Sequence, residues 1–230
     1  MRGSLRRVRV HAVLPIAALI ALLAGCGGGS DEVSSTSLKP RLLPASAIPG
    51  YGLERTLDWS DPVNLVGEGF FLPQTTHPTT AVKYLNDNGF EGAAGEVLTR
   101  GHGLDRSEVT VGVIKLKSAD DANKLRDWMH GQDMQQPCFA ECIFSPQTVP
   151  VPGAAPIKFV MQTAPAPKPP SGVKIPPGVK LPAQAQEGQA NYKFEFTKGP
   201  YVYFASLQAT PSAKAQVQAG AKAYFAQAKG

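Results

Sequence analysis

The chain has 230 residues, of which 43% are hydrophobic, enough to bury the core of a globular protein. Basic residues outnumber acidic ones by 23 to 18, but four arginines lie in the first nine positions. Without these four, 19 basic residues face 18 acidic ones, a net charge of +1 in place of +5. The composition therefore argues against the concentrated positive charge that nucleic-acid binding needs, and we expect no nucleic-acid partner.

Residues 1–25 have the features of a secretory signal peptide. The N-terminal arginines are followed by an apolar run from Ala12 to Leu23, and no acidic residue precedes Asp31. The run is shorter than the about 20 residues that a membrane-spanning helix requires. Arg9 stands where a twin-arginine signal usually has an apolar residue, so the sequence favours the general secretory route.

The apolar run ends in Leu23-Ala24-Gly25-Cys26, which resembles the lipobox of bacterial lipoproteins at every position. The resemblance implies cleavage before Cys26 and attachment of diacylglycerol, with palmitate-type acyl chains, to its thiol. Three glycines and Ser30 follow at once, and residues 26–39 suit a flexible tether. The two or three acyl chains of such proteins anchor far more firmly than one chain does.

With its lipobox and glycine tether, the chain resembles uncharacterised single-domain lipoproteins of high-GC Gram-positive bacteria. The resemblance implies a lipid-anchored protein on the extracytoplasmic face of the cell membrane, with membrane lipid as its partner through Cys26. It transfers no further site residue.

Residues 40–230 are predicted to form one α+β domain, a mostly antiparallel sheet of five to seven strands with helices packed on one face. The stretch 40–75 is rich in Pro and Gly and predicts loops with one or two short strands, one near 53–57. A helix is expected over 79–88, which ends at an Asn-Gly stop signal. A strand weakened by glycines follows over 90–99.

Alternation predicts a strand over 108–117, with Val109, Val111 and Val113 on one face. Ser118 is the expected N-cap of the next helix, whose first turn carries Asp120-Asp121. Four apolar residues then recur at helical spacing and are expected in the core: Ala122, Leu125, Trp128 and Met129.

The C-terminal part repeats this order of elements. Strands are expected over 192–197 and 201–207, followed by a helix that Thr210 caps and Pro211 begins. A hairpin followed by a capped helix thus occurs twice. The two stretches share no residue-level identity, so a common packing solution explains the pattern as well as a duplication does.

A proline-rich stretch separates the two halves. Twelve of the 21 prolines lie between Pro137 and Pro182, and a strand is expected only over 157–163. We predict an insert at about 164–186 that contributes little to the fold. It is either a passive loop or a contact with an anionic surface through its lysines: Lys168, Lys174 and Lys180.

With Cys26 acylated, Cys138 and Cys142 are the remaining thiols. Export favours a disulfide between them, which would close a short loop and contribute about 2 kcal/mol. Their spacing is not the redox Cys-x-x-Cys motif, and too few Cys or His residues lie nearby for a tetrahedral zinc site. We expect a local disulfide and no metal; free thiols are the main alternative.

The chain lacks the common catalytic and nucleotide-binding motifs, including the zinc-protease, nucleophile-elbow, Walker and Rossmann patterns. His77, His102 and His130 are scattered over three elements, and Asp120-Asp121 are more simply explained as helix-capping residues. We predict no catalytic residue and no cofactor, although dispersed residues can still assemble a site.

Aromatic residues gather in the second hairpin. They would line an apolar groove if one sheet face were open, or form core if helices covered it. The candidate ligand-facing side chains are Tyr192, Phe194, Phe196, Tyr201 and Tyr203, with Phe204 beside them.

Three functions remain compatible with these features. The first is a non-enzymatic binding or accessory module of the cell envelope, with an envelope protein as partner. The second is a carrier of lipid or another apolar ligand, which requires a cavity. The third is an envelope hydrolase with dispersed catalytic residues.

Overall fold

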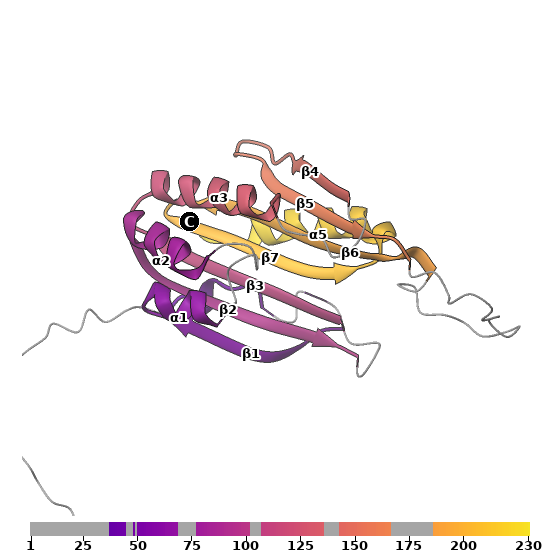
Figure 1. The fold of residues 1–230 in the computed structure, drawn as a ribbon, viewed down its shortest axis with the longest axis horizontal. Helices are drawn as coiled ribbons and strands as arrows, with labels where there is room; N and C mark the ends of the chain where they lie inside the picture. The colour runs from indigo at the N-terminus through magenta and orange to yellow at the C-terminus, as the bar shows by residue number, and fades with distance from the viewer. Residues whose placement is uncertain are drawn as a thin grey trace, which may run out of the picture. The chain divides into compact units, whose positions relative to one another are not determined.

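A seven-stranded antiparallel sheet is the centre of the part of the chain that the computed structural model describes, residues 37–44, 48, 50–68, 77–101, 107–135, 143–166 and 186–230. The strand order is β1-β2-β3-β7-β6-β5-β4 (Figure 1). The strands are β1 (Gly52–Trp59), β2 (Phe90–Arg100), β3 (Ser107–Leu116), β4 (Ile143–Val149), β5 (Ile157–Ala164), β6 (Gln189–Lys198) and β7 (Tyr201–Ala209).

Helices cover both faces of this sheet (Figure 1). On one face lie α1 (Pro62–Gly67), α2 (Pro78–Asp87) and α3 (Ala119–Asp133), and on the other lies α5 (Lys214–Gln227). Short 3-10 turns, η1 (Lys39–Arg41) and η4 (Pro211–Ala213), precede β1 and α5. The predicted α+β class with five to seven antiparallel strands is confirmed. The prediction places the helices on one face of the sheet. This is true of α1 to α3, but α5 packs on the other face.

The second helical layer is needed because the central strands are apolar on both sides. Along β3, Val111 and Val113 enter the core beneath α5, whereas Ile114 and Leu116 enter the core beneath α1, α2 and α3. All four are at most 1% exposed. Burial of such a side chain contributes about 1.5–3 kcal/mol, so an uncovered face would forfeit much of the stability of the fold.

The repeated order of hairpin and helix is present, as β2-β3-α3 and β6-β7-α5. At the centre of the sheet β3 and β7 are antiparallel neighbours. A twofold axis that exchanges two such strands is perpendicular to the sheet. Rotation about this axis leaves each helix on the face where it started, so helices related by it would share one face. Because α3 and α5 lie on opposite faces, the two halves share an order of elements and not a symmetric arrangement.

The ends of the two long helices differ in how well the sequence predicts them. Ser118 caps α3 as expected: its Oγ accepts from the Asp121 N–H at 3.1 Å and donates to the Asp121 carboxylate at 2.6 Å. Thr210 makes no side-chain capping bond, and Pro211 begins the 3-10 turn η4 instead of the α-helix. The helix α5 starts three residues later, at Lys214.

The two edge strands carry features that interrupt strand pairing. In β4, Pro146 pairs with Val160 of β5. Proline has no N–H to donate, which an edge strand tolerates and a central strand does not. In β1 the register shifts between Leu53 and Arg55, a bulge that bends the edge. Neither β4 nor the short helix α1 is predicted from the sequence.

Several candidate residues lie outside the described ranges, namely Cys26, Cys138, Cys142, His102 and the insert lysines Lys168, Lys174 and Lys180. Within the described ranges, no helix combines the length and apolar character that crossing a membrane would take.

We expect Gly112→Ala to destabilise the fold by about 1–3 kcal/mol. Gly112 is opposite Phe204 in the β3–β7 register, and the Phe204 ring occupies the space where a Cβ at position 112 would stand. The ring would have to leave its buried place. Chemical denaturation measures the loss, and adding Phe204→Leu should recover part of it.

Gly220→Ala is the matched control, because this glycine is exposed in α5 and a Cβ there would have nothing within 4 Å. Helix propensity predicts a gain of about 0.5–1 kcal/mol. Equal stability of the two single variants would contradict the close packing of β3 against Phe204.

Replacing residues 167–185 with a short Gly/Ser turn should leave the melting temperature within a few degrees. The two strands that flank the insert are antiparallel neighbours, with Ala164 directly opposite Gln189, so a short turn can join them. Thermal unfolding of the shortened chain provides the measurement. A chain that no longer folds would show that the insert belongs to the core.

Candidate functional site

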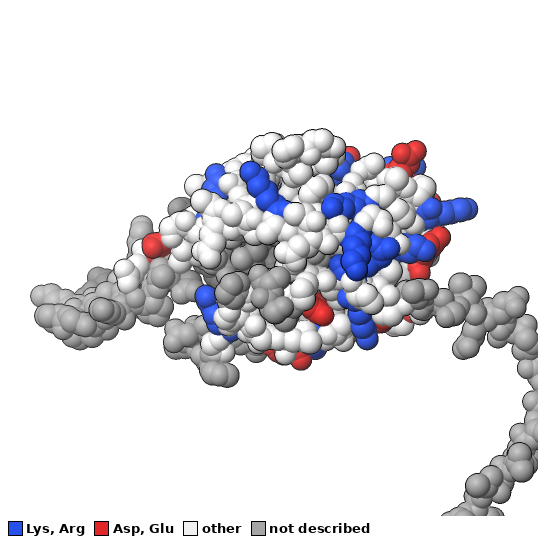
Figure 2. All heavy atoms as spheres, turned by 180° about the vertical axis from the view of Figure 1, so that it is seen from behind, with Lys and Arg blue, Asp and Glu red and all other residues white. Residues whose placement is uncertain are grey.

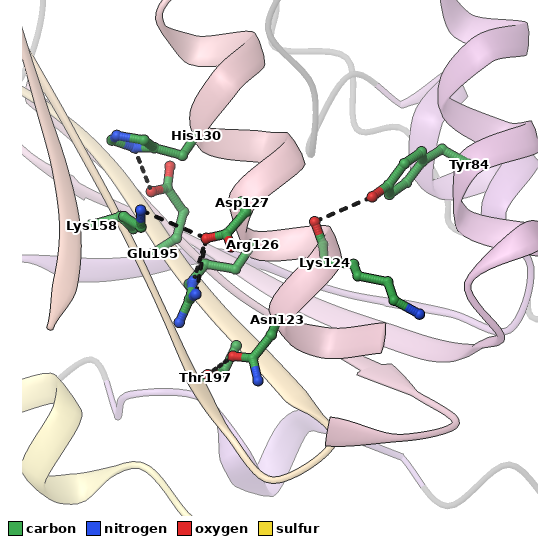
Figure 3. A network of polar contacts seen from close by, with 9 residues as sticks. All are labelled: Tyr84, Asn123, Lys124, Arg126, Asp127, His130, Lys158, Glu195 and Thr197. Atoms are coloured by element: carbon green, nitrogen blue, oxygen red, sulfur yellow. Dashed lines mark hydrogen bonds and ion pairs between the residues drawn. The ribbon is translucent and has the colours of Figure 1, made fainter. Parts of the chain in front are cut away.

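A group of charged and polar side chains lies between α3 and the strands β5 and β6 (Figure 3). On β6, alternate residues point toward α3: Lys193, Glu195 and Thr197. Their neighbours along the strand enter the aromatic core on the opposite face. On α3 the partners recur every three or four residues, as Asn123, Asp127, His130 and Asp133. Helical and strand periodicity thus bring two polar rows together.

Glu195 is the most deeply buried member of this network, with a side chain only 2% exposed. The carboxylate of Asp133 lies close enough to influence it, and Asp133 Oδ1 accepts a hydrogen bond from Lys193 Nζ at 2.6 Å. Burial, and then the nearby charge of Asp133, raise the pKa of Glu195 well above its ordinary value. This upward shift favours the protonated, uncharged form of the Glu195 carboxyl group.

His130 lies next to this carboxyl group (Figure 3), with Nδ1 3.5 Å from Glu195 Oε2. Neither atom has a hydrogen-bond partner within the described ranges, and 3.5 Å is too long for a strong bond. Burial is the main cause that lowers the pKa of His130, and the positive charge of Lys158 adds to it. Both shifts favour the uncharged forms, a neutral acid beside a neutral imidazole, so the 3.5 Å contact is better described as proximity than as an ion pair.

Ion pairs and hydrogen bonds surround this buried centre. The Asp127 carboxylate accepts two hydrogen bonds from Arg126, at 2.9 and 3.0 Å, and lies 3.7 Å from Lys158 Nζ. Thr197 donates to Asn123 at 2.9 Å. These contacts hold α3 against β5 and β6 along most of its length.

The opposite side of α3 is fixed to α2 by an aromatic pair. The rings of Tyr84 and Trp128 are stacked with centroids 4.5 Å apart, and the Tyr84 hydroxyl donates to the Lys124 carbonyl at 3.2 Å. Trp128 is partly buried and Met129 is buried, as the apolar stripe predicts. The helix is thus held from two sides.

The network offers little room for a reactant. The His130 side chain is 17% exposed, and a molecule could reach the Glu195 carboxyl group only if α3 moved. In the part of the chain that the structure describes, no three His, Cys, Asp or Glu side chains are arranged to hold a metal ion.

The candidate aromatics of the second hairpin lie in the core beneath α5, each at most 9% exposed: Tyr192, Phe194, Phe196, Tyr201 and Tyr203. Phe196 and Tyr203 stack at 5.2 Å, and Tyr224 of α5 packs edge-on against both rings. The Tyr192 hydroxyl donates to the Thr210 carbonyl at 2.8 Å. Phe204 lies on the opposite face, in the core beneath α1 to α3.

The other described histidine and acidic candidates lie at the starts of helices, and His77 and Asp121 have hydrogen-bond partners there. His77 precedes α2, and its Nδ1 lies 2.8 Å from the Thr79 hydroxyl. Asp120 and Asp121 lie in the first turn of α3 as expected. Among the candidates within the described residues, His130 joins the buried network. The sequence does carry a signal for this network: polar residues recur every three or four positions along α3, and alternate residues of β6 are polar.

The chain matches no protein-family model and no curated protein sequence. Among solved structures it resembles the extracellular domain of PknH from Mycobacterium tuberculosis, with 12% sequence identity and a TM-score of 0.42. The likeness covers 76% of this chain and 84% of that chain. Similarity at this level identifies neither a common family nor a common function.

We expect Glu195→Gln to become more stable relative to the unchanged protein as the pH rises. A raised pKa means that folded Glu195 keeps its proton after the unfolded chain has lost it, so the free energy of unfolding falls as the pH increases above about 4.5. The slope is at most about 1.4 kcal/mol per pH unit for one proton. Glutamine cannot ionise, and its amide can still donate to Asp133.

Denaturation of both proteins from pH 4 to pH 8 measures this difference, with about the same stability expected at the acid end. Glu68→Gln makes the same chemical change on an exposed side chain and controls for loss of charge. A Glu195→Gln variant destabilised equally at every pH would contradict a protonated Glu195. The lowered pKa of His130 has the opposite sign, since His130 reduces stability as the pH falls below about 6.5.

Proposed function

We propose that this chain is a lipid-anchored protein of the extracytoplasmic face of the cell membrane. The observation that carries the proposal is the lipobox Leu23-Ala24-Gly25-Cys26 after a basic and apolar signal. The described fold begins at Ser37, eleven residues after Cys26, so the chain has room for an anchor ahead of the domain.

We further propose that the domain is a non-enzymatic binding or accessory module of the cell envelope. The buried acid–base network supports this interpretation, because its carboxylates already have cationic partners. Asp133 is bound to Lys193, Asp127 to Arg126 with Lys158 nearby, and the raised pKa of Glu195 favours its uncharged form. Such a network fastens a helix to a sheet. An activity that both His130→Ala and Glu195→Gln abolish in folded protein would contradict the proposal and favour an envelope hydrolase.

The packing of the aromatic residues also favours this module over an apolar-ligand carrier. Tyr224 and Phe225 of α5 fill the space against Phe196, with ring centroids 5.4 and 5.1 Å away. A ligand could reach these rings only by displacing α5, at the cost of the buried contacts of the helix. The expected partner is therefore another envelope component that binds the outside of the domain.

Replacing Cys26 with Ser should abolish acylation and move the protein out of the membrane fraction or leave it unprocessed. Labelling with a palmitate analogue, fractionation and intact mass measure the three outcomes. The matched control is the pair Cys138→Ser and Cys142→Ser, which removes the other thiols and should leave acylation unchanged. Normal acyl mass and membrane localisation of the Cys26→Ser protein would refute the anchoring.

A further inference from the structure

Basic side chains converge where η1, the β6–β7 turn and the last residues of the described chain meet. The Arg41 guanidinium lies 3.7 Å from the centroid of the Tyr201 ring and donates to the Lys229 carbonyl at 3.0 Å. Lys198 Nζ donates to the Ala228 carbonyl at 2.8 Å. We name this group the η1 cluster; its members are Lys39, Arg41, Lys115, Lys198 and Lys229.

The η1 cluster has a local excess of positive charge. Two acidic side chains accompany its five basic ones: Glu91, 2.6 Å from Lys115, and Asp58, 4.0 Å from Lys39. The side-chain charge of the group is therefore +3, whereas the whole chain after signal removal carries only +1. Figure 2, seen from behind the view of Figure 1, shows Lys and Arg gathered over one part of the surface.

The fold holds these cations close together at a cost. The hydrogen bond with Glu91 is the main cause that raises the pKa of Lys115, and the positive charge of Arg41 is a smaller influence that opposes this shift. Backbone oxygens of Ala228, Lys229 and Gly230 and two aromatic rings fix Arg41 and Lys198 in place. A surface of negative charge would relieve this repulsion without any rearrangement of the cluster.

The cluster lies where the chain enters the fold. Eleven residue steps separate Cys26 from Ser37, and at about 3.5 Å per step they span at most about 40 Å. Lys39 follows two residues later, with a side chain 48% exposed. A lipid on Cys26 would therefore limit the distance between the cluster and the headgroups to a few tens of ångströms, and at contact the attraction acts over about 8 Å in physiological salt.

The Pro/Lys insert leaves the sheet at the other end. It connects Ala164 to Gln189, which face each other in the β5–β6 register, whereas Lys198 stands at the opposite end of β6. Nine residue steps of a strand separate Gln189 from Lys198, about 30 Å. The end of the sheet that is tethered and the end that carries the insert are therefore different surfaces.

We propose that the η1 cluster binds anionic phospholipid headgroups of the membrane that holds the Cys26 lipid, and that this contact turns the tethered end of the sheet toward the bilayer. The inference rests on the lipid anchoring proposed above. Flat anionic headgroups fit it better than a single phosphate, because the basic groups come from separate elements, η1, β3, β6 and the C-terminal residues.

The experiment uses the mature chain from position 26 with Cys26→Ser, so that binding is measured without a lipid anchor. This protein should co-sediment with vesicles that contain phosphatidylcholine and phosphatidylglycerol, and the bound fraction should fall as the salt concentration rises. It should not co-sediment with vesicles of phosphatidylcholine alone. Lys39→Gln with Lys229→Gln should weaken binding about tenfold or more, since each basic residue at an anionic surface contributes about fivefold. Both side chains are exposed, and an unchanged melting temperature verifies the fold.

The matched control, Lys83→Gln with Lys124→Gln, removes the same charge from α2 and α3 and should bind as before. Equal loss in the control, or loss only when Lys168, Lys174 and Lys180 are replaced, would overturn the proposal. Full competition by dilute glycerol phosphate would also overturn it, in favour of a free phosphate ligand.

The two proposals fail in different ways. An acylated protein whose Cys26→Ser form ignores anionic vesicles refutes the η1 cluster and leaves the anchoring intact. A chain that binds such vesicles but carries no acyl group in cells refutes the anchoring, while the lipid affinity of the cluster is upheld.

Discussion

The central strands of this sheet are covered on both faces, and this double burial governs the rest of the structure. A strand in that position must be apolar on both sides, as β3 is, or its buried polar and charged side chains must have partners. The strand β6 takes the second course. Its aromatic side packs beneath α5, and its polar side requires the acid–base network of α3. The network is thus a consequence of where β6 lies in the sheet.

The sequence predicts the elements whose periodicity is long and regular. The alternating valines of β3 and the capped stripe of α3 are examples, because side-chain spacing reports directly on local backbone geometry. It does not predict β4, since Pro146 breaks the pattern and is tolerated only because β4 has one neighbour. It also cannot predict which face α5 covers, because an apolar stripe indicates that a helix packs and not against which surface.

The candidate site shows the same limit. In the sequence, Glu195 and Lys193 have the positions expected for the solvent-exposed side of an alternating strand. Asp133 has a position expected for the polar side of a helix. Only tertiary structure shows that these two polar sides face each other, with Lys193 bound to Asp133 and Glu195 left neutral. The aromatic residues of β6 and β7 are the opposite case, because their period-2 pattern is consistent with either a groove or a core. The rings of α5 decide it.

The two interrupted edges of the sheet matter most if the protein is held on a membrane. Anchored copies share a thin layer, so their edges meet far more often than those of freely diffusing molecules. An open strand edge is a template for addition of another strand, and a row of such additions would build a fibre along the bilayer. Pro146 lacks an N–H donor on one edge strand, and the bulge of β1 bends the other, so both edges are poorer templates for strand addition. Both features would hinder strand-to-strand addition between copies that crowd on a surface.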